Sequence, residues 1–205
     1  ADGKKYDAVF LPGANVTVVK GAGDDGIAGN ADDVSGDLII KDAKDVTMDV
    51  TATVVVDGSV NIGGDGDVTG DITLTNITLD SNGDGDPGAG ANVPASLNVR
   101  STAGNVILAG TIDVNADPDV AKQANAITIT ADAGSILNQS GSAIAIDEVD
   151  NLTLSAKGSI GTADKPITVN AKTITLTSTS ATADDANIYI TNTPNILNID
   201  DSGDG

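Results

Sequence analysis

The sequence predicts an all-β protein built as a parallel β-helix, in which short strands coil around a narrow apolar interior. Three observations support this. Val, Ile and Thr, which favour strands, dominate short segments that end at Gly, Asn or Asp. The 205-residue chain contains two Tyr, one Phe and no Trp, whereas the core of a β-sandwich usually relies on large aromatic side chains. Similar units also recur along the chain. A β-sandwich remains the alternative.

The predicted strands are short, and alternation of apolar and polar residues is cleanest at 71–75 and 173–177. One short segment, 117–125, has a helical pattern instead. We expect a single solenoid domain over residues 1–205, with the repeat least visible in residues 1–70. The predicted strands are 16–19, 37–40, 46–50, 53–56, 72–79, 96–99, 106–114, 127–130, 144–146, 152–154, 167–169, 174–177, 188–190 and 196–199.

The recurring unit is a five-residue strand of the type Asp-Ile-Thr-Leu-Thr. It starts at Asp71, Ala126, Asn151 and Lys172, so successive units are separated by 55, 25 and 21 residues. The intervals are unequal, which indicates a degenerate repeat with insertions.

Composition excludes several classes of function. The formal net charge is −20, with 30 acidic and 10 basic side chains and a single Arg, Arg100. Binding to a nucleic-acid backbone needs clustered Lys and Arg, so no nucleic-acid partner is expected. The chain has no Cys and no His, which excludes disulfides, thiolate or imidazole metal sites and Ser-His-Asp catalysis. No apolar segment approaches the ~20 residues of a membrane span.

The C-terminal half resembles a known family. The segment 151–176 contains Leu-Thr-Leu-Ser, then Gly-Ser-Ile-Gly, a polar loop and Pro-Ile-Thr-Val, and 133–141 and 103–112 are similar to it. This order resembles successive coils of filamentous-haemagglutinin-type exoproteins. The resemblance covers residues ~100–180. It implies a secreted, right-handed parallel β-helix that acts as a stalk, adhesin or surface fibre, and it implies no catalytic residues.

The segment 80–86 has the spacing of a calcium loop. Asp80, Asn82 and Asp84 provide oxygen ligands at positions 1, 3 and 5, and a Gly follows at position 6. Asp86 would offer its backbone carbonyl. The loop resembles dockerin and thrombospondin type-3 loops in its first half only, because position 12 is Ala91 and not Glu. A solvated Asp/Gly turn is the alternative.

A second acidic cluster precedes residue 40. Carboxylates this close together would repel one another strongly without a cation among them, so Ca²⁺ is again expected. The alternative is an acidic hairpin loop. The candidate ligands are Asp24, Asp25, Asn30, Asp32, Asp33 and Asp37.

Two further clusters are candidates for calcium. The glycine-rich turn 63–67, with Asp71 nearby, is similar to repeats-in-toxin turns, and its ligands would be Asp65 and Asp67. The last residues have the first half of the same loop pattern, with Asp200, Ser202 and Asp204 as ligands. Residues 1–3 of another subunit would complete that site.

The expected function is therefore a calcium-stabilised, extracellular or cell-surface structural protein that polymerises head to tail with copies of itself. The alternative is a segment of a large modular adhesin, whose neighbouring β-helix modules cover its ends and which contacts cell-surface glycans. An enzyme is not expected, because the densest carboxylates outside the loops, Asp147, Glu148 and Asp150, fit a solvated turn. Ice binding needs Thr-x-Thr pairs stacked at constant spacing, and the intervals here do not repeat.

Overall fold

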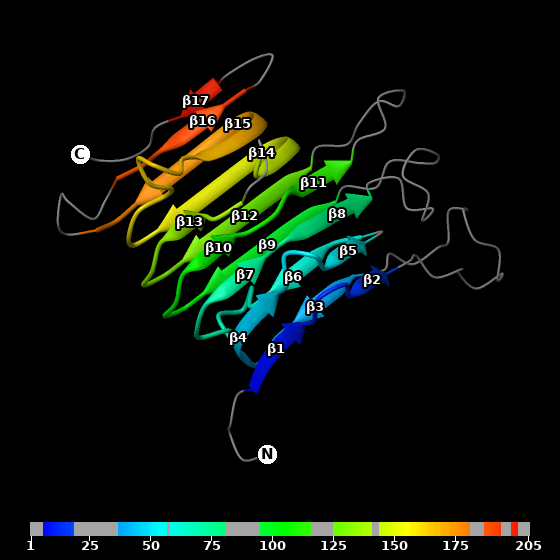
Figure 1. Ribbon diagram of the computed structural model, residues 1–205. Helices are drawn as coiled ribbons and strands as arrows, with labels where there is room; N and C mark the ends of the chain where they lie inside the picture. The colour runs from blue at the N-terminus through cyan, green and yellow to red at the C-terminus, as the bar shows by residue number, and fades with distance from the viewer. Residues whose placement is uncertain are drawn as a thin grey trace.

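The computed structural model describes residues 6–18, 37–56, 58–80, 95–115, 125–140, 144–180, 187–193 and 198–200. Over these ranges the chain forms strands and turns without a helix, so the described part holds no helix suited to crossing a membrane. Every pair of neighbouring strands that the structure describes is parallel, in one sheet of five strands and one of twelve. The strands curl around a common interior (Figure 1), which confirms the all-β, parallel, solenoid-like prediction.

The strands lie on three faces, and each pass of the chain over the three faces is called a coil. The first face is β1 (Tyr6–Phe10), β4 (Ala43–Met48), β7 (Ile72–Leu74), β10 (Val106–Leu108) and β13 (Ile136–Asn138). The second is β2 (Asn15–Val18), β5 (Thr53–Val56), β8 (Asn76–Asp80), β11 (Ile112–Asn115), the first halves of β14 (Ile146–Ala156) and β15 (Ile167–Ser178), and β16 (Ile190–Asn192). The third is β3 (Leu38–Ile40), β6 (Val60–Ile62), β9 (Ser96–Ser101), β12 (Ala126–Ala131), the second halves of β14 and β15, and β17 (Asn198–Asp200).

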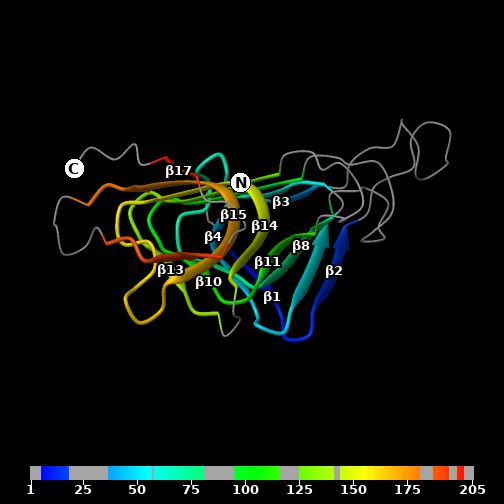
Figure 2. The ribbon, with the colours of Figure 1, turned by 90° about the horizontal axis from the view of Figure 1, so that it is seen from above.

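The described residues make seven coils. The first face continues beyond its five strands through two isolated bridges, at Ile160 and Ile188, which gives one position for each coil. In the fifth and sixth coils, β14 and β15 run from the second face onto the third without a break. The pairing of β14 with β15 shifts register between Ile146 and Val149, which marks the bend. Figure 2, which looks from above Figure 1, shows the coils superimposed.

The core consists of aliphatic ladders along the stack. On the first face, the inward residues Val46, Ile72, Val106 and Ile136 are register partners in successive coils, and each is 0% exposed. On the third face, Ile129 and Leu154 are stacked in the same way and are equally buried. Period-two alternation places these side chains inside and Thr, Asn and Ser outside. Fully burying one such side chain contributes about 1.5–3 kcal/mol.

Among the described residues, two predicted strands are each divided in two, two pairs of predicted strands are joined into β14 and β15, and three strands were not predicted. The segments 72–79 and 106–114 each form two strands, because the chain turns a corner at Thr75 and at 109–111. Thr75 is buried, and its hydroxyl donates a hydrogen bond to the carbonyl of Ala52 in the preceding coil. Because this corner is stabilised by a contact with another coil, the sequence at Thr75 contains no local turn signal such as Gly or Pro. The strands missed are β1, β6 and β13.

The recurring units do not all occupy one place in the coil. The units that start at Ala126, Asn151 and Lys172 are aligned on the third face, where Ala126, Asn151 and Thr173 are register partners. The unit at Asp71 leads into β7, which lies on the first face. The two units that are 55 residues apart therefore lie on different faces, which explains much of the irregularity in the spacing of the repeat. Of the predicted helical segment, residues 117–124 lie outside the described residues.

Candidate functional site

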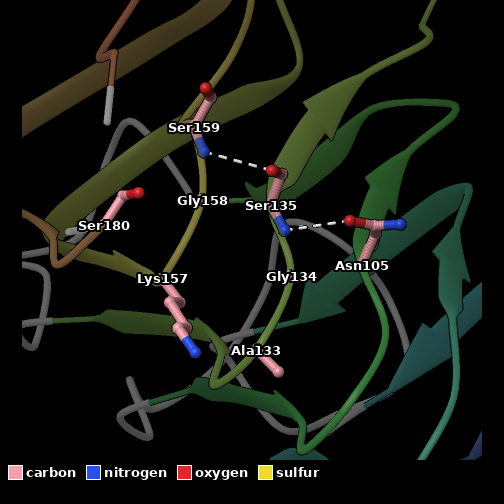
Figure 3. A pocket seen from close by; sticks show the side chains of 8 residues that line it. All are labelled: Asn105, Ala133, Gly134, Ser135, Lys157, Gly158, Ser159 and Ser180. Atoms are coloured by element: carbon pink, nitrogen blue, oxygen red, sulfur yellow. Dashed lines mark hydrogen bonds between the residues drawn. The ribbon is translucent and has the colours of Figure 1, made fainter. Parts of the chain in front are cut away.

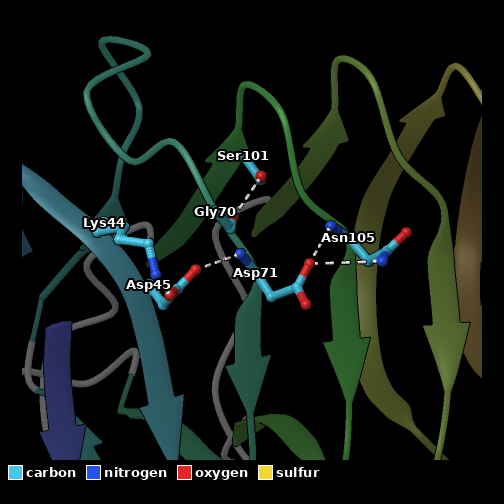
Figure 4. Close-up of polar contacts among 6 residues, drawn as sticks. All are labelled: Lys44, Asp45, Gly70, Asp71, Ser101 and Asn105. Atoms are coloured by element: carbon cyan, nitrogen blue, oxygen red, sulfur yellow. Dashed lines mark hydrogen bonds and ion pairs between the residues drawn. The ribbon is translucent and has the colours of Figure 1, made fainter.

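A ladder of polar side chains joins five successive coils where the chain turns from the third face onto the first. The carboxylate oxygen Oδ1 of Asp45 accepts a hydrogen bond from the backbone N–H of Asp71 at 2.9 Å, and Oδ1 of Asp71 accepts one from the N–H of Asn105 at 2.7 Å. Oδ1 of Asn105 then accepts from the N–H of Ser135 at 2.9 Å, and Oγ of Ser135 accepts from the N–H of Ser159 at 3.1 Å. Figure 4 shows the ladder from Asp45 to Asn105. Each side chain thus fixes the coil that follows it.

The ladder has a sequence signature. Its members Asp71, Asn105, Ser135 and Ser159 each follow a Gly and precede a buried Ile or Val. The motif Gly-(Asp/Asn/Ser)-(Ile/Val) therefore marks the start of the first face. The Gly-Ser-Ile part of the family resemblance falls on it. Asp71, which lies near a candidate calcium turn in the sequence, accepts a hydrogen bond from the next coil.

The glycines of this motif are required by close contact between coils. A Cβ on Gly104 would lie 2.3 Å from the carbonyl carbon of Gly70, and a Cβ on Gly134 would lie 2.2 Å from the carbonyl oxygen of Gly104. A Cβ on Gly158 would lie 2.3 Å from Oγ of Ser135. Because each glycine packs against the coil before it, larger side chains are excluded here.

The glycines of this motif, Gly70, Gly104, Gly134 and Gly158, form a glycine stack. A shallow groove of ≈ 370 Å³ runs along its C-terminal part (Figure 3). The hydrogen-bond acceptors of Asn105 and Ser135 in this groove are already used in the ladder. Lys157 supplies a cation, and the described residues that line the groove include no carboxylate, so they provide no pair of acids for glycoside hydrolysis. We interpret the groove as the solvent-facing side of the contacts between successive coils. Its lining residues are Asn105, Ala133, Gly134, Ser135, Lys157, Gly158, Ser159 and Ser180.

An ion pair supports the N-terminal end of the ladder. Nζ of Lys44 lies 2.7 Å from Oδ2 of Asp45. This hydrogen bond, together with the one from the N–H of Asp71, lowers the pKa of Asp45. The lowered pKa means that the folded state favours the carboxylate, so this stabilisation is present at neutral pH and is lost as the pH falls through the pKa of the folded state. Lys44 is exposed, and the pair adds little in water.

We expect Asp71→Ala to lower the free energy of unfolding by about 1 kcal/mol, because it removes the acceptor for the N–H of Asn105. Asp71→Asn keeps an oxygen acceptor and should retain most of that stability. Urea-induced unfolding followed by circular dichroism measures both changes. Asp164→Ala, at an exposed aspartate, is the control. Equal stability of Asp71→Ala and Asp164→Ala would contradict a stabilising role for the ladder.

Few of the candidate calcium ligands lie within the described residues. Asp65 and Asp67 lie in the turn between β6 and β7, and Asp37 precedes β3, where its Oδ1 accepts a hydrogen bond from the N–H of Ser59 at 2.8 Å. Asp80 and Asp200 end β8 and β17. No group of three or more carboxylates suited to a metal ion occurs among the described residues. The candidates outside them are Asp24, Asp25, Asn30, Asp32, Asp33, Asn82, Asp84, Asp86, Ser202 and Asp204.

The carboxylates at 147–150 do not form the solvated turn that was expected. They lie within β14, at its bend between two faces. Oδ1 of Asp147 accepts a hydrogen bond from the side-chain amide of Asn170 at 2.8 Å. Oδ2 of Asp150 accepts one from the N–H of Asn125 at 3.0 Å, and its other oxygen contacts Nζ of Lys172. These two carboxylates therefore connect neighbouring coils.

The two ends of the coil stack differ from its middle. Inward residues of the first coil, among them Phe10 and Leu38, are only partly buried, as are Leu176 and Ile190 near the other end. Ile188 is 41% exposed, whereas Ile160, its partner in the preceding coil, is 0% exposed. Within the described ranges, β1, β2 and β3 each have a strand on one side only. Both ends thus present apolar side chains. Among the described residues, β16 and β17 of the last coil also pair with β15 alone, so both ends present open strand edges.

Comparison with family models, curated proteins and solved structures found no match to the chain.

Proposed function

We propose that this chain is a subunit of an extracellular, calcium-stabilised fibre in which right-handed β-helices stack head to tail. The observation that carries the proposal is the partial burial of the core at both ends of the stack. Open parallel edges pair readily with further strands. A second copy placed in the same orientation supplies strands of the same direction, and such head-to-tail contacts generate an open filament.

The same ends suit covalent neighbours. A modular adhesin would continue the coils with adjacent modules of its own chain, without pairing between separate molecules. Self-association separates these two functions, because only the fibre subunit polymerises as the isolated 205-residue chain.

The topology supports the calcium part of the proposal. In the sequence, the acidic segments 19–36 and 81–94 separate β2 from β3 and β8 from β9. In both cases the strand before the segment lies on the second face and the strand after it lies on the third. Ca²⁺ is bound by clustered carboxylate and carbonyl oxygens, and the millimolar calcium outside cells suits sites with Kd of ~10⁻⁴–10⁻³ M. Binding to the folded state alone would add about 2.7 kcal/mol per site at 100 times Kd.

The test uses the full chain with millimolar calcium or with EGTA. We expect negative-stain electron microscopy to show filaments of uniform width in calcium, and melting curves to shift downwards in EGTA. Phe10→Lys should prevent another copy from stacking on the first coil, and Ile190→Lys should prevent stacking on the last coil. Each variant should be monomeric in sedimentation velocity, whereas an equimolar mixture should form dimers through the two intact ends.

Val9→Lys and Thr191→Lys are the matched controls, because they place the same charge on outward positions of the same strands. Both should still form filaments. A wild-type chain that stays monomeric in calcium would contradict the fibre and favour the adhesin segment. Melting curves that coincide in calcium and EGTA would contradict calcium stabilisation.

A further inference from the structure

The third face carries a regular array of hydroxyl side chains. Thr128, Thr153 and Thr175 are register partners in β12, β14 and β15. Two residues further along the same strands, Thr130, Ser155 and Thr177 are partners as well. We call these six residues the threonine array. The unequal intervals in the sequence hide this alignment, because the extra residues lie in the connections between strands.

The array has a two-dimensional repeat. Neighbouring strands of a sheet lie ~4.8 Å apart, and alternate residues of a parallel strand lie ~6.6 Å apart. Register is unbroken from Ala126 to Ala131 against both neighbouring coils. The residues between the hydroxyls, such as Ile129 and Leu154, point inwards and are buried, which holds the strands in place. The six hydroxyl side chains are all half-buried.

The array carries no charge in a chain of net charge −20. The column beside it, Ala126, Asn151 and Thr173, is uncharged as well. Charged residues begin at its borders. Arg100, the register partner of Thr130, pairs with Asp132, and Asp200 is the register partner of Thr175. Lys172 contacts Asp150.

The hydroxyls of the array make no hydrogen bonds to other described residues. Elsewhere, threonine hydroxyls are used within the fold: that of Thr51 donates to Asp49, that of Thr75 to the carbonyl of Ala52, and that of Thr111 to the carbonyl of Ile144. The array therefore presents ordered hydroxyl and methyl groups that the coils do not need.

We propose that the threonine array binds the surface of crystalline ice. Oxygen atoms on ice surfaces repeat at spacings close to those between the stacked hydroxyls and along each strand. Water held by the hydroxyls and ordered around the methyl groups would thus already match the lattice, and the rigid strands keep this order without a further cost in conformational entropy. An array without charged side chains avoids the strong hydration of ionic groups, which would orient water differently from the ice lattice. This inference does not depend on calcium binding or on stacking of the ends.

The test measures ice growth in solutions of the full chain. We expect a nanolitre osmometer to show faceted ice crystals and a gap between melting and freezing temperatures, and we expect inhibition of ice recrystallisation. Thr153→Lys and Thr175→Lys place a cation within the array and should each lose all three effects. Thr47→Lys, an exposed outward threonine of β4 on the first face, should retain them. Unfolding curves verify that all variants fold.

Three results would overturn the proposal. The first is a folded wild-type chain that leaves ice growth unchanged. The second is equal ice activity of Thr153→Lys and Thr47→Lys. The third is that the wild-type chain forms side-by-side dimers through this face, and that Thr153→Lys abolishes these dimers without changing the effect of the chain on ice growth. The end variants Phe10→Lys and Ile190→Lys should keep the ice activity, so a failed fibre and a failed ice surface are distinguishable.

Discussion

Replacement of Ile72 by Ala is expected to lower the free energy of unfolding by about 2–5 kcal/mol, because truncation of a fully buried aliphatic side chain leaves a cavity in the core. Ile72 is 0% exposed and is stacked between Val46 and Val106 in the adjacent coils. The narrow interior offers few side chains that can move into the space. Urea-induced unfolding should be followed by circular dichroism, since the chain contains no Trp.

Thr73→Ala is the matched control. Thr73 is the next residue of β7 and lies on the outer side of the same strand, where it is half-buried. Its truncation should change stability by much less than that of Ile72. Equal losses for the two variants would contradict the inward placement of Ile72, and with it the register of the first face.

Gly134→Ala is expected to destabilise the stack by about 1–3 kcal/mol through overpacking. The added Cβ would lie 2.2 Å from the carbonyl oxygen and 2.6 Å from the carbonyl carbon of Gly104. These are backbone atoms, so relief requires the fifth coil to move away from the fourth. That movement would also lengthen the hydrogen bond from the N–H of Ser135 to Asn105.

Ala133→Ser adds one heavy atom at the neighbouring exposed position and should be close to neutral. The comparison is made by thermal unfolding. Wild-type stability of Gly134→Ala would show that adjacent coils are not in close contact at this corner.

The sequence predicted the kind of structure well, because its signals are local and repeated. Alternation in units such as 126–130 and 173–177 places Ile and Leu inside and Thr outside wherever the strand lies. The near absence of aromatic residues favoured a narrow interior. The resemblance around 151–176 contained the Gly-Ser-Ile motif that forms the ladder and the glycine stack, although its role was not apparent from the residues alone.

The corners were harder to predict. The strands from Ile72 to Asp80 are interrupted at Thr75 without a Gly or Pro, because the hydroxyl of Thr75 and the amide of Asn76 bond to carbonyls of the preceding coil. Asp147 and Asp150 seemed to form a turn, since acidic residues close in sequence usually face solvent. They instead join coils from within β14. These contacts link residues more than 20 positions apart, which no local pattern reveals.

The sequence by itself determined that the chain forms short strands with one apolar side, since that depends only on neighbouring residues. The tertiary structure alone decided which strands stack on one another. Coils of unequal length bring Thr128, Thr153 and Thr175 into one column and separate them from the similar unit at Asp71. The physical reason is that each coil must place its own apolar side chains over those of the coil before, and residues added between strands do not alter that alignment.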